Sequence, residues 1–210
     1  MSDPATPAMH RWGTASAIAF GALAVAWFFL AAVPDVIDAP NHVLDVYADP
    51  GTRGRIFAGT VLLALAGAFL LAFLADVHHV LRAVQSGPPA TLALLGGAVF
   101  VALLLLAGAL LAVLPLLIEF DEVSARVDPD LAAVVVQLAV VLLLLFAPIA
   151  AATLVLAISI AALRHRLLAP WLARTGLGLA VLLPFSVLGF PLALLSLWIV
   201  AAGVGLGVRR

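Results

Sequence analysis

Long runs of uncharged, apolar residues constrain this chain more than any other feature. They cover residues 14–33, 56–75, 90–118, 131–163 and 175–208. An α-helix needs about 20 apolar residues to cross a bilayer core of roughly 30 Å. Hydrophobic residues make up 66% of the chain and charged residues only 10%, so polar side chains could not cover the core of a water-soluble domain. The sequence predicts an all-α transmembrane bundle, with residues 1–210 forming a single domain.

The two longest runs leave the number of spans open. The run 131–163 contains Pro148 near its middle and is too short for two spans, so it predicts one helix bent at the proline. The run 175–208 is interrupted by Pro184 and by Gly189 to Pro191. It fits either one long kinked helix or a hairpin of two short helices that turns near Gly189. The hairpin gives six spans and the single helix gives five.

The arginines favour six spans and a cytoplasmic N-terminus. That orientation places Arg11, Arg82, Arg164, Arg166 and Arg174 inside, and Arg53, Arg55 and Arg126 outside. Cytoplasmic loops carry an excess of arginine and lysine, so the positive-inside rule supports it. Arg209 and Arg210 would obey the same rule only with an even number of spans. We expect a multi-pass protein of a bacterial plasma membrane, with an N-terminal helix that is retained rather than cleaved.

The chain contains a faint repeat with a spacing of about 80 residues. Asp49-Pro50 corresponds to Asp128-Pro129, and Arg82 corresponds to Arg164. The repeat predicts a first hairpin over 1–88 with an outer acidic segment 34–55, and a second over 89–170 with an outer acidic segment 119–130. Residues 171–210 would form a C-terminal hairpin. Both units would have the same orientation, although any helical hairpin with a cytoplasmic N-terminus also has acidic outer and basic inner ends.

Few polar residues lie at bilayer depth, and none of them is ionisable. They are Thr60, Gln137, Thr153, Ser159, Ser186 and Ser196. A proton-coupled pump, a voltage sensor or an intramembrane protease would keep an ionisable residue there. We expect the hydroxyls to bond backbone carbonyls and Gln137 to bridge two helices. The sequence predicts no catalytic residue and no cofactor.

Two groups of residues are candidate metal ligands. The first comprises the outer carboxylates Glu119, Asp121, Glu122, Asp128 and Asp130, which could hold a hard cation such as Ca²⁺. The second comprises His78, His79 and His165 at cytoplasmic helix ends. The alternative for the first group is a solvated acidic loop with arginine counter-ions. The alternative for the second is the ordinary preference of histidine for helix C-termini. Asp128-Pro129 also predicts a helix start.

Two further patterns concern packing. Residues 41–49 form a short amphipathic stretch, which would either lie on the outer membrane surface with Tyr47 at headgroup depth or cap the bundle. Small residues recur every fourth position at Gly13, Ala17 and Gly21, at Ala64, Ala68 and Ala72, and at Gly203 and Gly207. Such faces pack helices closely, either within one chain or against a second copy or another membrane protein. The expected partners are therefore membrane lipid and membrane proteins, and the few basic residues exclude nucleic acid.

The runs YADPGTRGRI at 47–56 and PWLARTG at 170–176 resemble segments of multi-pass membrane proteins of actinobacteria that have no known activity. The resemblance implies a bundle of about six helices and transfers no site residues. Our first hypothesis is an accessory, sensing or scaffold subunit without enzymatic activity. The alternative is a transporter of a small solute or lipid, with a cavity between the hairpins. An enzyme that uses the outer carboxylates is the least favoured.

Overall fold

The computed structural model describes residues 11–30, 45–84, 87–119, 128–188 and 190–208, and these residues form helices without any strand. The helices are α1 (Arg11–Leu30), α3 (Pro50–Ala83), α4 (Gly87–Glu119), α5 (Pro129–Val141), η1 (Leu142–Phe146), α6 (Ala147–His165), α7 (Pro170–Leu182), η2 (Leu183–Leu188) and α8 (Phe190–Val208). Among the described residues, α1, α3, α4 and the continuous helix from α5 to α6 are each long and apolar enough to cross a membrane. The predicted all-α bundle is confirmed.

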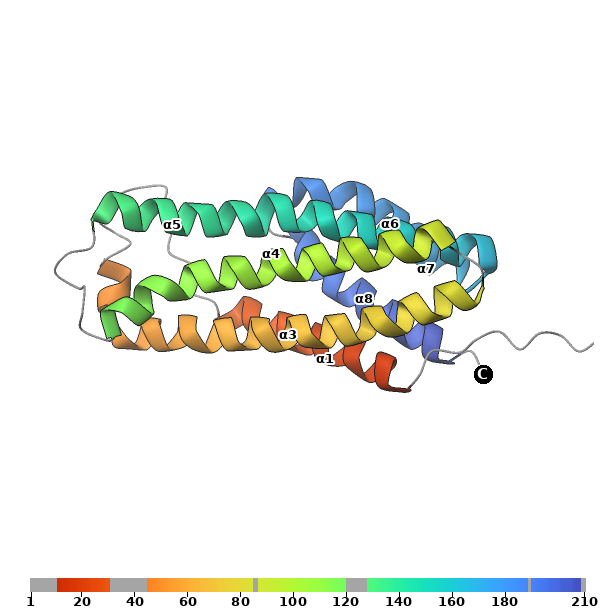
Figure 1. The fold of residues 1–210 in the computed structure, drawn as a ribbon, viewed down its shortest axis with the longest axis horizontal. Coiled ribbons are helices and arrows are strands. Elements are labelled where there is room, and N and C mark those ends of the chain that lie inside the picture. The colour runs from red at the N-terminus through yellow and green to blue at the C-terminus, as the bar shows by residue number, and fades with distance from the viewer. Residues whose placement is uncertain (1–10, 31–44, 85–86, 120–127, 189, 209–210) are drawn as a thin grey trace, which may run out of the picture.

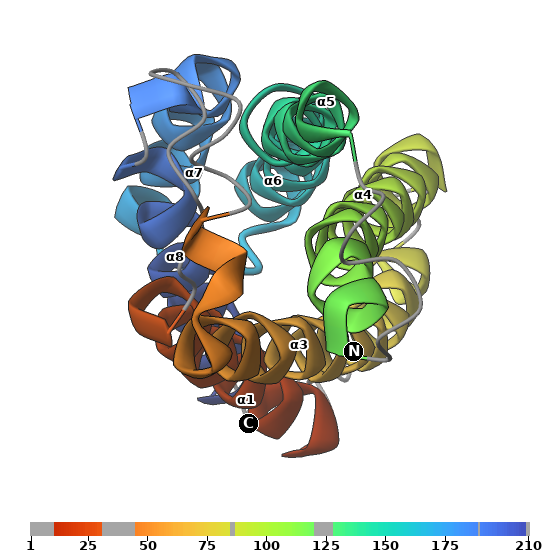
Figure 2. The same ribbon diagram turned by 90° about the vertical axis from the view of Figure 1, so that its left-hand side faces the viewer.

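The helices lie side by side along one axis (Figure 1). Most of the described arginines lie towards one end of this axis and most of the described carboxylates towards the other, although Arg53 pairs with Glu119 at the second end and Asp76 lies near the first. We call one end the arginine end; it carries Arg11, Arg82, Arg164, Arg166 and Arg174. The other is the acidic end; it carries Asp45, Asp49, Glu119, Asp128 and Asp130. Viewed from the acidic end, the helices surround a common interior, and the helical turn at 45–48 lies across it (Figure 2).

Two Asp-Pro pairs start helices at the acidic end. The Asp49 carboxylate accepts a hydrogen bond of 2.8 Å from the backbone N–H of Thr52, and Pro50 is the first residue of α3. The Asp128 carboxylate accepts one of 2.9 Å from the N–H of Asp130, and Pro129 begins α5. The predicted helix start at Asp128-Pro129 is confirmed. Because α3 has 34 residues, it is about 50 Å long and extends beyond a bilayer core of roughly 30 Å.

Glycines set the close contacts of α4 with its two neighbours. On Gly97, a Cβ atom would overlap the Leu74 side chain of α3. On the adjacent Gly96, a Cβ atom would lie 2.9 Å from the backbone nitrogen of Leu154 in α6. The two glycines point in different directions because successive residues of a helix are about 100° apart. Each therefore lets a different helix approach, and α4 lies between α3 and α6.

Two of the three small-residue faces meet within the chain. Ala17 of α1 lies against Gly203 of α8, and the Thr14 hydroxyl donates a hydrogen bond of 3.2 Å to the Gly203 carbonyl. Gly21 and Gly207 extend this contact in opposite directions, so α1 and α8 are antiparallel. The third face, Ala64, Ala68 and Ala72, is exposed on the outside of α3.

The C-terminal run forms a hairpin rather than one kinked helix. The Trp198 Nε1–H of α8 donates a buried hydrogen bond of 3.1 Å to the Leu172 carbonyl of α7. Gly205 lies against Leu168 and Leu172, while Gly176 lies against Trp198. Position in α8 therefore advances as position in α7 declines, which makes the two helices antiparallel. The beginning of α1 and the end of α8 therefore both lie at the arginine end of the bundle (Figure 1).

The proline in the run 131–163 leaves one continuous helix, as predicted, but changes its winding. Residues Leu142–Phe146 are π-helical, and Pro148 follows two residues later. Proline has no N–H to give the carbonyl four residues earlier, and its ring crowds that carbonyl. A wider π turn relieves the crowding, and such turns are frequent at functional sites. The turn places Leu143 and Leu144 on the wall described next.

Candidate functional site: an apolar cavity beneath a tyrosine cap

A cavity of about 350 Å³ lies where α1, α3, α4, η1 and α8 converge. Its volume falls within the range of roughly 300–1,000 Å³ that is typical of small-molecule sites. Almost all of its lining is apolar, and Ser196 supplies the one side-chain oxygen. The lining residues are Phe20, Ala24, Val25, Trp27, Phe28, Phe29, Leu63, Ala66, Phe100, Leu104, Leu143, Leu144, Ala193, Leu195 and Ser196. Such a lining suits hydrocarbon and gives a polar solute few hydrogen-bonding groups to replace its water.

The cavity opens beside the last turns of α1. Deep in the cavity, Phe100 and Leu104 are almost completely covered by the protein. At the rim, Phe28 is 58% exposed and Phe29 is 76% exposed, with their rings edge to face at 5.9 Å. Both rim residues belong to a helix that is apolar enough to cross a membrane. Lipid chains around the protein would therefore meet the mouth of the cavity directly.

Tyr47 closes the interior at the acidic end. Its side chain is fully buried in a small cluster that is separate from the main core of the bundle. This cap cluster comprises Tyr47, Ile56, Leu111, Leu114, Ala132, Ala133, Val136 and Ala139. Of the two alternatives for the amphipathic stretch, the described part caps the bundle rather than lying on the membrane surface. Residues 41–44 lie outside the described residues.

Arg53 holds the turn at 45–48 in place. Its guanidinium donates hydrogen bonds of 2.9 Å and 3.0 Å to the backbone carbonyls of Tyr47 and Ala48. Its Nε atom forms an ion pair of 3.1 Å with the carboxylate of Glu119 at the end of α4. One side chain therefore ties the turn to both α3 and α4. The prediction of an arginine counter-ion for the outer carboxylates is confirmed for this pair.

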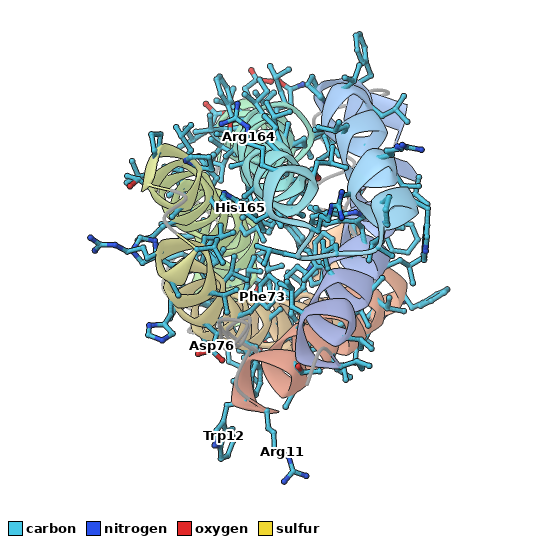
Figure 3. All side chains as sticks on the ribbon, turned by 90° about the vertical axis from the view of Figure 1, so that its right-hand side faces the viewer. Arg11, Trp12, Phe73, Asp76, Arg164 and His165 are labelled. Carbon is cyan, nitrogen blue, oxygen red and sulfur yellow. The ribbon has the colours of Figure 1, made fainter. Side chains whose placement is uncertain are left out.

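Three buried side-chain oxygens among the described residues have no hydrogen-bond partner: Tyr47 Oη, Asp76 Oδ2 and Ser159 Oγ. Asp76 lies towards the arginine end, beside the beginning of α1, as Figure 3 shows with Arg11 and Trp12. Ser159 is buried in α6 against Gly176, which also lies against Trp198. Tyr47 lies in the cap cluster at the acidic end, and burial raises the pKa of its phenol to about 12.

The polar residues predicted at bilayer depth do not converge on one site. The hydroxyls of Thr60 and Thr153 donate to the carbonyls of Ile56 and Ile149, at 3.0 Å and 3.2 Å, as expected. Gln137 is exposed on the outer face of α5, contrary to the expectation that it bridges two helices. The side chain of Ser186 lies outside the described residues. Thr60 and Gln137 thus share no polar cavity.

The candidate metal ligands also stay apart. Among the described residues, no three histidine, aspartate or glutamate side chains gather in a way that could hold a metal ion. Glu119 pairs with Arg53, Asp128 caps α5, and Asp121 and Glu122 lie outside the described residues. His78 Nδ1 lies 3.1 Å from the Ala90 carbonyl, while His79 and His165 are exposed. Figure 3 shows Asp76 and His165 on different helices at the arginine end.

Comparisons with protein families, with curated proteins and with solved structures found no match to this chain. The function must therefore be inferred from the site itself. From the sequence, a cavity between the hairpins belonged only to the alternative transporter hypothesis, and of the lining residues only Ser196 was named. The one local signal was the run of aromatic residues Trp27, Phe28 and Phe29 at the end of the first apolar run.

Proposed function

We propose that this protein is an integral plasma-membrane protein without enzymatic activity that binds the hydrocarbon chain of a membrane lipid in its apolar cavity. The observation that carries the proposal is the lining of the cavity, which is aromatic and aliphatic and lies between the first hairpin, the second hairpin and α8. Within the transporter hypothesis, this apolar lining favours a lipid over a small solute as the transported molecule. A protein that binds or transfers a lipid also fits the hypothesis of a sensing subunit. Such a subunit would respond to whether a lipid chain occupies the cavity.

In the proposed topology the chain crosses the membrane six times and both termini are cytoplasmic. The antiparallel contact of α7 with α8 supports an even number of crossings. The five arginines of the arginine end support its cytoplasmic placement under the positive-inside rule. In this topology α7 and η2 together span about 30 Å, which is enough for a bilayer core. The mouth of the cavity then faces the outer half of the bilayer, because Phe28 and Phe29 are at the acidic end of α1.

Photo-crosslinking in vesicles tests the proposal. The protein is reconstituted in phosphatidylcholine vesicles that contain a small fraction of phosphatidylcholine with a diazirine in one acyl chain. After illumination, mass spectrometry locates the labelled residues. We expect label on Phe100 and Leu104, which line the cavity and are at most 5% exposed, so lipid on the outer surface cannot reach them. Absence of label at both positions would contradict the proposal.

Matched pairs of variants distinguish the effect of a substitution inside the cavity from the effect of the same substitution on the exposed surface. Ala66→Phe places a ring in the cavity, whereas Ala64→Phe adds the same ring two residues away on the exposed face of α3. We expect the first to reduce label on Phe100 at least fivefold and the second to leave it unchanged. Ala24→Phe and Ala26→Phe form an equivalent pair on α1, in case the first substitution impairs folding. Equal effects within both pairs would refute the assignment of the cavity.

A further inference from the structure

We propose that Phe20 limits the length of the hydrocarbon chain that enters the cavity, so that the site takes one acyl chain of up to about 17 carbons. This inference rests on the proposed function and specifies the ligand class of that site. The first observation is the shape of the cavity. On α1 its lining runs from Phe20 to Phe29, nine residues or about 13.5 Å along the helix axis. Exposure rises in the same direction, from 2% at Phe20 to 76% at Phe29. The cavity is therefore open at its rim and closed at Phe20.

A contact between α3 and α4 gives the depth of Phe100, which also lines the cavity. Gly97 of α4 lies against Leu74 of α3, and the two helices run in opposite directions (Figure 1). Phe100 is three residues nearer the acidic end than Gly97. It is therefore level with Leu71, which is three residues nearer the same end than Leu74.

A contact with α8 places Phe20 at almost the same depth. Ala17 of α1 and the ring of Phe73 in α3 both lie against Gly203. Phe20 is three residues nearer the acidic end than Ala17, so it is level with Leu70. Side chains of a helix lean towards its N-terminus, and both α1 and α4 begin at the arginine end (Figure 1). The two phenylalanine rings thus lean towards the arginine end and form the floor of the cavity.

The core below this floor is closely packed. Leu70, Phe73 and Leu74 are at most 1% exposed. On Gly21, a Cβ atom would overlap the Val200 side chain, so α1 and α8 are in close contact here. Within Arg11–Leu30, no residue before Phe20 lines the cavity. A chain that enters from the rim must therefore stop at the floor.

The length and the volume of the cavity both fit one chain. An extended hydrocarbon chain advances about 1.25 Å per carbon, since C–C bonds of about 1.5 Å meet at about 111°. A length of about 13.5 Å therefore holds about 11 carbons. A cavity of about 150 Å³ holds the six carbons of benzene, so about 350 Å³ holds about 14 carbons. Two chains side by side would need about 22 carbons, which is more than this volume holds.

The depth of the floor in the bilayer sets the length of the whole chain. The apolar run of α3 begins at Ile56, directly after Arg55. In the proposed topology, Ile56 marks the outer edge of the hydrocarbon core. Leu70, level with the floor, is fourteen residues further along α3, or about 21 Å. An outer-leaflet chain of about 17 carbons spans that distance, and a longer chain must bend outside the mouth.

Phosphatidylcholines with a diazirine on the last carbon of one acyl chain test the inference. Extended chains of about 12, 16 and 22 carbons end about 15, 20 and 28 Å from the headgroup. Each lipid is added at the same small fraction to phosphatidylcholine vesicles that contain the protein. We expect the 12-carbon chain to label mainly Leu104, which is four residues nearer the acidic end than Phe100, and the 16-carbon chain to label Phe100. Label on Phe100 should fall at least about fivefold with the 22-carbon chain, as expected when extra methylene groups are forced against a packed core.

Two substitutions of the same kind distinguish the floor from the rim. Phe20→Ala removes six ring carbons at the floor, whereas Phe28→Ala removes the same ring at the rim. We expect the first to raise the ratio of 22-carbon to 16-carbon label on Phe100 at least about fivefold, and the second to leave the ratio unchanged. Phe20→Leu removes fewer atoms and should raise the ratio by less, which provides a second variant in case Phe20→Ala impairs folding. The ratio within one variant does not depend on how much protein is folded.

Equal label on Phe100 from the 16-carbon and 22-carbon chains in wild type would overturn the inference while leaving the proposed function intact. An unchanged ratio in both Phe20 variants would overturn it as well, because the floor would then not depend on this ring. Absence of label on both Phe100 and Leu104 with every chain would instead refute the proposed function.

Discussion

Replacing Gly96 with alanine tests the backbone contact that positions α4 beside α6. The added methyl group would lie 2.9 Å from the Leu154 nitrogen and 3.1 Å from the Ala150 carbonyl oxygen, whereas ordinary contact begins at 3.4 Å. Both atoms belong to helix backbone, so the helices must separate by about 0.5 Å along their contact. Overpacking of this kind costs about 1–3 kcal/mol, and alanine regains up to about 1 kcal/mol of helix propensity. We expect a net loss of about 1–2 kcal/mol in the free energy of unfolding.

Unfolding by sodium dodecyl sulfate in mixed micelles, followed by circular dichroism, measures this loss. The control is Gly178→Ala in α7, where an added Cβ atom meets nothing within 4 Å and the residue is exposed. We expect that variant to be as stable as wild type or slightly more stable. Equal stabilities of Gly96→Ala and Gly178→Ala would contradict a tight backbone contact at Gly96.

Three further predictions concern the cap. Arg53→Met removes both carbonyl contacts and the ion pair, so hydrogen exchange of the backbone amides at 45–48 should accelerate at least tenfold. The control Glu119→Gln loses only the ion pair at the protein surface and should have a much smaller effect on this exchange. The Thr52 hydroxyl and backbone N–H hold the pKa of Asp49 below 3.8, so the Asp49 cap stabilises above that pH and is lost as pH falls through the folded pKa. Protection of the Thr52 amide, relative to free-peptide exchange, should therefore drop in acid in wild type but not in Asp49→Asn. Tyr47 is the single tyrosine, and burial raises its pKa to about 12. Its contribution to stability is complete below pH 10 and declines towards pH 12, and absorbance at 295 nm should titrate near 12; a midpoint near 10 would contradict the buried cap.

The sequence predicted those features that depend on residues near one another in the chain. Asp128-Pro129 begins a helix because the carboxylate and the proline act within one turn. Pro148 perturbs its own helix, although the periodicity of the sequence did not distinguish a bend from a π turn. The C-terminal run had two interpretations because both satisfy its local preferences. The contact of Trp198 with Leu172, 26 residues apart, decides between them.

The candidate site depended far more on long-range packing. Tyr47 was predicted either at the membrane surface or over the bundle, and the amphipathic pattern fits both placements equally. Burial of its ring requires neighbours from α3, α4 and α5, and Arg53, which binds the carbonyls of the turn, is itself paired with Glu119, 66 positions away. Gln137 looked like a bridge between helices because it is polar in an apolar run. Its side chain faces outward, since the helix phase set by packing, rather than polarity, determines which residues turn inward.

Sequence reasoning was sufficient to predict that the chain is a bundle of apolar helices, that a helix begins at Asp128-Pro129, and that most arginines and most carboxylates lie at opposite ends of the bundle. These properties follow from composition, proline and side-chain capping, which act over one or two turns of helix. Only the tertiary structure decided that α7 and α8 form a hairpin, that two small-residue faces meet within the chain, and that an apolar cavity lies beneath Tyr47. A cavity is the space left where helices from five parts of the chain fail to fill their common interior, so no single segment encodes it.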